Sequence, residues 1–141
     1  DILLDFAMVM NDDGHLGGDI TSKNGIYPDN IERFIDEIMV SPFLKQTGLY
    51  PKDIMEIVHF VDTDGVYIAD DLVASSGNES DAPVYYSDYI VTGNPAHVVE
   101  RNHRKSENLD VLSSLSSIKI GSKKIKYSTY YFSCNLDLHF Q

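Results

Sequence analysis

Two aspartates, Asp62 and Asp64, stand directly after a short apolar run and directly before Gly65. The run covers residues 57–61, is rich in β-branched side chains and has a turn signal behind it, which predicts a buried central strand. In open α/β sheets, ligands bind outside the carboxyl ends of such strands. Two neighbouring carboxylates repel each other unless a cation lies between them, and such oxygen ligands suit Mg²⁺ or Mn²⁺. The spacing therefore predicts a metal site formed by Asp62 and Asp64.

The same four residues, Asp-Thr-Asp-Gly at 62–65, are also good turn formers. Asx side chains bond their own backbone, and glycine lets the chain turn tightly or adopt a positive φ. For such a tetrapeptide on its own, a plain turn is the more common structure. The apolar run in front of it is the reason to consider a metal site, and both interpretations stay open on the sequence.

Length and composition narrow the class of protein. We expect the 141 residues to form a single domain, 1–141, because they are enough to bury a core of their own. With 43% apolar and 23% charged residues, the chain is globular rather than disordered. It has no run of 18 apolar residues, so we expect no membrane span. Its one cysteine, Cys134, excludes an intrachain disulfide and favours a cytoplasmic protein.

Charge is distributed unevenly along the chain. The net charge of −11 argues against loose binding to nucleic acid. Residues 100–126, however, hold seven cations against three acids, about +4, which leaves about −15 on the remainder. Part of this basic segment lies on a predicted helix, where a solvated helix face is the plainer explanation. The candidate nucleic-acid-binding residues are Arg101, Arg104 and Lys105 on the exposed face of that helix, and Lys123 and Lys124 beyond it.

Periodicity and turn signals predict the remaining elements. A Gly- and Asp-rich stretch, residues 11–24, includes Asp12, Asp13, His15 and Asp19 but lacks the spacing of a calcium loop, so we expect a mobile surface loop. Tyrosines and β-branched residues predict one strand over 84–91. Together the elements indicate an α/β fold with a central, largely parallel sheet flanked by helices. The other predicted elements are helices at 2–10, 28–40 (ended by Ser41-Pro42) and 95–115, and strands at 118–120 and 124–134.

The Asp-x-Asp-Gly motif resembles the opening motif of the haloacid-dehalogenase-like phosphohydrolases, in which an apolar strand leads into the same pattern. That resemblance implies Asp62 as nucleophile, Asp64 as general acid/base and a bound Mg²⁺. The segment Ile-Val-Thr-Gly-Asn at 90–94 is similar to that family's second motif, and Lys105 is the candidate for its later lysine. For the family's downstream acidic pair, only the single Asp137 is present.

The motif also resembles TOPRIM-like domains, and among them the RloB-like and related abortive-infection proteins. In TOPRIM domains one strand ends in a glutamate and a later strand in Asp-x-Asp, which together hold Mg²⁺. The segment 131–140, with Asp137 and His139, is similar to the RloB-like segment that ends in His-Phe, although its proline is missing. No glutamate suits the first position. The Asp-Ile-Leu-Leu at the start would follow it, so we expect a fragment that lacks an N-terminal strand and some C-terminal residues.

The resemblance to TOPRIM domains implies a TOPRIM-like fold and a metal-dependent nuclease of bacterial anti-phage defence, with Mg²⁺ or Mn²⁺ as cofactor. Asp62 and Asp64 would bind the metal, and Asp137 and His139 would add a third acid and a proton-transfer group. The alternatives are the phosphohydrolase with Asp62 as nucleophile and a non-catalytic binding module. Nucleic acid, a separate ATPase and further copies of this chain are the candidate partners.

Overall fold

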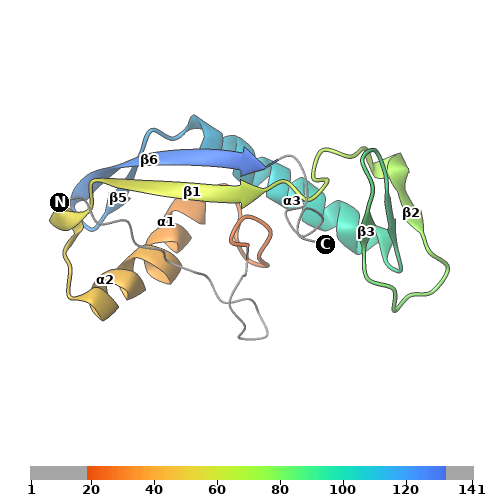
Figure 1. Cartoon of the computed structure of the whole chain (residues 1–141), viewed down its shortest axis with the longest axis horizontal. Helices are drawn as coiled ribbons and strands as arrows, with labels where there is room; N and C mark the ends of the chain where they lie inside the picture. The colour runs from red at the N-terminus through yellow and green to blue at the C-terminus, as the bar shows by residue number, and fades with distance from the viewer. Residues whose placement is uncertain (1–18, 133–141) are drawn as a thin grey trace.

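The computed structural model describes residues 19–132. Its main sheet contains the strand that was predicted to lead into Asp62 (Figure 1). β1 (Glu56–Asp62) is parallel to β6 (Lys123–Phe132), in a register that pairs Asp62 with Phe132. β5 (Ser117–Ile120) pairs antiparallel with the other edge of β6. The sheet order is therefore β1-β6-β5, and the carboxyl ends of β1 and β6 lie at the same edge.

A second, smaller sheet lies beyond that edge (Figure 1). Its order is β2-β4-β3, with β2 (Val73–Ser75) parallel to β4 (Ile90–Thr92) and β3 (Val84–Tyr85) antiparallel to it. The single strand expected over 84–91 is thus a tight hairpin of two short strands. The Tyr86 N–H donates to the Tyr89 carbonyl, and the two rings stack with centroids 4.3 Å apart.

The expectation of a central, largely parallel sheet flanked by helices, and with it of a TOPRIM-like fold, is wrong. The described strands form two small mixed sheets, each with one parallel and one antiparallel pair. The strand at 84–91 was expected to join the sheet of β1, but the polar Ser87-Asp88 turn folds it back on itself. The described helices also do not cover both faces of the main sheet, because Val58 and Phe60 on the opposite face of β1 are exposed.

Two helical regions, residues 31–47 and residues 95–114, pack on one face of the main sheet. The first runs as α1 (Ile31–Phe34), a π-helical segment (Ile35–Val40) and α2 (Ser41–Thr47). Pro42 was expected to end this helix, but it lies in the first turn of α2, where its missing N–H is tolerated. Gly48, with φ of 73°, ends α2 instead. Short 3₁₀ turns occur at Pro51–Asp53 and Asp70–Leu72.

The long helix α3 (Pro95–Ser114) was predicted almost residue for residue. The Asn94 side chain accepts the His97 N–H at 3.1 Å, and Pro95 occupies the first turn, as the sequence indicated. Gly93, just before the cap, has no room for a side chain, because a Cβ there would lie 2.4 Å from the Asn78 carbonyl oxygen. The start of α3 is therefore packed closely against the loop of the small sheet.

The core lies between the helices and one face of the main sheet. Along β6 buried side chains alternate with exposed ones, the pattern of a sheet with one covered face. Within residues 19–132, no helix combines the length and apolarity that crossing a bilayer requires. The main buried cluster consists of Ile20, Ile26, Ile31, Ile35, Val40, Leu44, Leu112, Ile118, Ile120, Ile125 and Tyr127.

Candidate active site at the end of the first strand

The chain turns sharply immediately after β1. The Val66 N–H donates to the Thr63 carbonyl at 2.8 Å, and the two residues between them, Asp64 and Gly65, have φ of 45° and 66°. Asp64 is the one non-glycine residue with positive φ among residues 19–132, in a conformation that aspartate tolerates better than most residues. Such backbone strain is concentrated at functional sites. The turn interpretation of the sequence is therefore correct, and the turn also fixes the direction of the Asp64 side chain.

Lys105 is the cation that the Asp64 side chain meets. Its side chain is fully buried, and its Nζ lies 3.0 Å from Asp64 Oδ2 and 2.7 Å from Asp19 Oδ2. The two carboxylates remain partly exposed, at 26% and 29% of their side-chain area. A buried ammonium group is tolerated only when it is paired in this way. Lys105 thus joins three segments, the turn after β1, the middle of α3 and the chain at residue 19.

Asp19 is held in place for this contact by the residues that follow it. Its Oδ1 accepts the Thr21 N–H at 2.8 Å and the Thr21 hydroxyl at 2.6 Å. The α3 side chains fasten the same segment, because Arg104 donates to the Ser22 carbonyl at 3.0 Å and Asn108 to the Thr21 carbonyl at 2.8 Å. Residues 19–24 form a loop without helix or strand, as predicted, but it does not lie on the surface throughout, because Ile20 and Thr21 are buried.

Arg101 supports the turn from its other side. Its Nη2 donates to the Asp64 carbonyl at 3.2 Å and its Nη1 to the Tyr85 hydroxyl at 2.6 Å. The guanidinium also donates to Asn102 Oδ1 at 2.8 Å. Because Tyr85 belongs to β3, one side chain ties the small sheet to the turn that follows β1. Removing it would loosen both.

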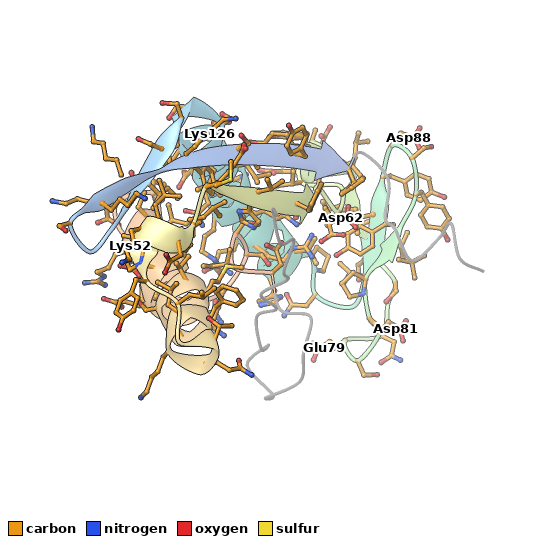
Figure 2. All side chains as sticks on the ribbon, turned by 60° about the vertical axis from the view of Figure 1, so that its left-hand side comes forward. Lys52, Asp62, Glu79, Asp81, Asp88 and Lys126 are labelled. Atoms are coloured by element: carbon orange, nitrogen blue, oxygen red, sulfur yellow. The ribbon has the colours of Figure 1, made fainter. Side chains whose placement is uncertain are left out.

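Asp62 lies at the end of β1 (Figure 2). Its Oδ1 accepts the Asp64 N–H at 3.2 Å, an Asx turn that leaves the carboxylate half-buried. Alternation along β1 puts its side chain on the same face as Phe60, and away from buried Val61. Asp62 therefore borders the exposed face of the sheet, whereas Asp64 reaches α3.

The two aspartates that share Lys105 have pKa values moved in opposite directions. Burial acts to raise the pKa of Asp19, but the charge of Lys105 and the hydrogen bonds from Lys105 and Thr21 outweigh it, so this pKa is lowered. Burial raises the pKa of Asp64, and the Asp62 charge adds to that effect against the opposing Lys105. Asp64 is thus the carboxylate that more readily takes up a proton. Opposed pKa shifts of this kind separate acid and base roles in active sites.

A buried polar pair lies next to this cluster under β1. His59 Nδ1 is 2.7 Å from the Tyr127 hydroxyl. Burial raises the pKa of Tyr127 to about 12, so its hydroxyl stays protonated and hydrogen-bonds the imidazole, the histidine tautomer deciding which group donates. Burial lowers the pKa of His59, although the charge of Asp19 opposes this. His59 is therefore a neutral histidine of the core, linked electrostatically to the Lys105 cluster.

The predicted basic residues are dispersed. Arg104 and Lys105 were expected on an exposed helix face, and this is wrong. Both side chains are buried and bind the segments 19–26 and 62–65. Arg101, expected on the same face, is half-buried. Lys123 donates to the Lys52 carbonyl at 3.1 Å, and Lys124 is exposed on β6. Of the other candidates, Asp137 and His139 lie outside the described residues, as do Cys134, Asp12, Asp13, His15 and the helix predicted at 2–10.

Sequence reasoning missed the role of Asp19. The residue stood in a Gly- and Asp-rich stretch typical of loops, with nothing nearby to pair with. Its signal was the apolar Ile20 directly after it and the Asp-x-Thr pattern, which closes an Asx-type hydrogen bond. Its partner, Lys105, is 86 positions further along the chain, a separation that no local pattern spans.

Replacing Lys105 by methionine should destabilise the protein strongly. The change leaves Asp19 and Asp64 facing each other without a cation, and breaking a buried pair in this way costs about 3–5 kcal/mol. Urea denaturation measures the loss. Lys124→Met on exposed β6 is the matched control and should change the free energy of unfolding by less than about 0.5 kcal/mol. Equal effects of the two substitutions would contradict the anchoring role of Lys105.

His59 should make stability depend on pH near neutrality. Its folded-state pKa lies below the usual histidine value of 6.5, so on acidification the unfolded chain takes up the proton first. This contribution is complete above about pH 7 and is lost as the pH falls toward the folded pKa. Urea midpoints between about pH 7.5 and 5 should fall less steeply in His59→Gln than in the wild type. His97→Gln, a change at an exposed position, should retain the wild-type dependence of the urea midpoint on pH. Parallel profiles for all three proteins would show that His59 does not cause this dependence.

Comparison with protein-family models, curated proteins and solved structures found no match. The resemblances to TOPRIM-like domains and to haloacid-dehalogenase-like phosphohydrolases therefore rest on the quoted motifs alone. A function has to be argued from the chemistry of the site itself, which consists of a strained strand-end turn, two adjacent carboxylates and a buried lysine.

Proposed function

We propose that Asp62 and Asp64 bind Mg²⁺ or Mn²⁺ and that this protein hydrolyses nucleic-acid phosphodiesters. The observation that carries the proposal is the placement of two carboxylates at the shared carboxyl edge of parallel β1 and β6, in a turn fixed by Lys105 and Arg101. That edge is where ligands of parallel strands bind. Carboxylate oxygens on a turn held in this way are hard ligands of the kind that Mg²⁺ and Mn²⁺ prefer.

The donor set favours a cation that keeps part of its water shell. Within residues 19–132 there is no group of three or more His, Cys, Asp or Glu side chains that could enclose a metal. Mg²⁺ is commonly held by one or two carboxylates, with water and substrate phosphate as the other ligands. Asp62 and Asp64 fit that arrangement, and a closed zinc or calcium cage does not.

The side chains around the cation site have separate roles. Asp62, half-buried at the border of the open face, would be the ligand nearest to solvent. Lys105 and Arg101 fix the orientation of Asp64, and Asp19 keeps Lys105 in place from behind. A divalent cation bound there would activate a water molecule and neutralise charge on the transferring phosphate.

The biological setting is part of the same proposal. The resemblance of the Asp-x-Asp motif to TOPRIM-like and abortive-infection proteins supports a role in bacterial defence against phage. Such an activity would be exercised in the cytoplasm, in agreement with the single cysteine of the chain. A separate ATPase or another copy of this chain would be the partner in that role.

Metal titration tests the proposal. Millimolar Mg²⁺ or Mn²⁺ should raise the thermal midpoint, because a ligand at 100 times its dissociation constant stabilises the folded state by about 2.7 kcal/mol. Asp62→Asn should abolish this shift together with the metal-dependent cleavage of labelled DNA and RNA oligonucleotides. Asp71→Asn, at an exposed position of a 3₁₀ turn, is the control and should retain both. The absence of any shift in the wild type would favour a non-catalytic binding module.

A phosphohydrolase that uses Asp62 as nucleophile is the second candidate. One support is Lys105, which occupies the place of the lysine that this family uses and bonds Asp64. A second is the raised pKa of Asp64, which suits a proton donor to the leaving alcohol. The position of Thr92, which belongs to the segment similar to that family's second motif, is evidence against the phosphohydrolase. Thr92 belongs to β4 in the separate small sheet, and its Oγ1 accepts the Asn94 N–H at 3.3 Å.

Trapping experiments separate the two chemistries. The phosphohydrolase would form an acyl-phosphate on Asp62 as the substrate P–O bond breaks, with Asp64 giving the leaving oxygen its proton. Peptide mapping after borohydride reduction should then find Asp62 modified, and beryllium fluoride with Mg²⁺ should stabilise the wild type but not Asp62→Asn. The phosphodiester hydrolase uses water as nucleophile, so we expect oligonucleotide cleavage without any such adduct.

A further inference from the structure

Among the described residues 19–132, the helices leave one face of the main sheet uncovered along β5, β6 and β1. On β6, Ile125 and Tyr127 are buried under the helices, whereas Lys124, Lys126 and Tyr130 are exposed. The described helices all pack on the buried side, with Ile118 and Ile120 of β5. The opposite side is thus a second surface of the same sheet, and its side chains are those that alternate with the core.

Three aromatic rings form a cluster on this open face. Phe60, Tyr130 and Phe132 are 58%, 55% and 37% exposed, and Phe60 lies between the other two, with its ring centroid 5.9 Å from each. The parallel register pairs Phe60 with Tyr130 and Asp62 with Phe132. An exposed cluster of this size costs solubility unless it binds something. The cluster also adjoins the carboxylate that ends β1.

Lysines occupy the other end of the same face. On this face β5 and β6 present Lys119, Lys124 and Lys126, and neither strand contains an acidic residue, although the chain as a whole carries −11. Lys119 and Lys124 are direct cross-strand partners, an arrangement that is unfavourable unless an anion lies over it. Lys126 is paired with Glu56 at 3.1 Å. Figure 2 shows Lys126 part of the way along β6 and Asp62 at the tip of β1.

We propose that this face binds single-stranded nucleic acid. Bases would stack on Phe60, Tyr130 and Phe132, and the phosphate backbone would follow Lys119, Lys124 and Lys126. Aromatic side chains beside cations on an open sheet are the combination by which proteins hold unpaired bases, whereas a duplex keeps its bases stacked inside. A strand on this platform leads directly to Asp62, two residues beyond Phe60 on β1. The inference rests on the proposed hydrolase function, whose substrate class it names.

Binding is measured without catalysis so that the two proposals can fail separately. Fluorescence anisotropy with labelled 20-residue oligo-dT and oligo-U in EDTA reports binding alone, and a duplex of the same length is the competitor. Phe60→Ala and Tyr130→Ala should each weaken binding about 5- to 100-fold, the range observed when a stacking ring is removed. Tyr50→Ala, which removes a 65% exposed ring away from this face, is the matched control and should leave affinity unchanged.

The lysines are tested by the dependence of binding on salt. Lys124→Glu should weaken oligonucleotide binding and lower the slope of log affinity against log salt by about 0.7 or more, since each phosphate contact releases counterions. Lys45→Glu, an equivalent exposed change on α2, should leave that slope unchanged. Thermal unfolding of all variants confirms that each remains folded, and the exposed positions of the changes make this the expected result.

Several results would overturn the inference. These are no binding of either single strand, equal binding of the duplex, or an affinity unaffected by Phe60→Ala. Self-association that Phe60→Ala abolishes, measured by sedimentation, would also overturn it and assign the face to a second copy of this chain. Binding without metal-dependent cleavage would support the platform and reject the hydrolase, and cleavage with unchanged affinity in Phe60→Ala would do the reverse.

Discussion

The ion pair network of Lys105 is the interaction on which the candidate site depends. A fully buried ammonium group must find anions, and here it finds Asp19 and Asp64, from segments far apart in the chain. The same contact fixes the start of the described chain against α3 and sets the orientation of the turn after β1. Lys105 and the hydrogen bonds to Asp19 outweigh burial there, so the pKa of Asp19 is lowered. Burial outweighs Lys105 at Asp64, so the pKa of Asp64 is raised. One lysine therefore provides both mechanical support and the electrostatic asymmetry that acid/base chemistry needs.

A second constraint is the division of the main sheet into a covered face and an open one. Covering one face with α1, α2 and α3 gives the core, and strict alternation then places Phe60, Tyr130, Lys124 and Lys126 on the other. Asp62 lies at the border between the open face and the Lys105 ion pairs. Alternation puts its side chain on the open face, whereas the side chain of Asp64 contacts Lys105 on α3. A substrate on the open face would thus approach the carboxylates from the side of Asp62.

Local patterns predicted the elements well wherever the cause was local. Strand β1, the N-cap and proline of α3, and the hairpin of β5 and β6 all follow from side-chain types within a few residues. The strand at 84–91 was wrong because its aromatic residues suit a strand and a hairpin equally, and Tyr86 and Tyr89 stack across the turn. The basic helix face was wrong because long cationic side chains are usually solvated, whereas Arg104 and Lys105 are drawn inward by acceptors that α3 itself does not contain.

The sequence by itself determined that an apolar strand ends in two aspartates and a glycine, that a long capped helix follows, and that cations are concentrated in the last third of the described chain. These properties depend on neighbouring residues, whose spacing is fixed by covalent geometry. Only the tertiary structure decided that Asp19 and Asp64 share Lys105, that the strands divide into two small mixed sheets, and that three aromatic rings adjoin Asp62 on an open face. The physical reason is that burial, ion pairing and sheet register depend on residues tens of positions apart, and nothing in the local sequence fixes which of them meet.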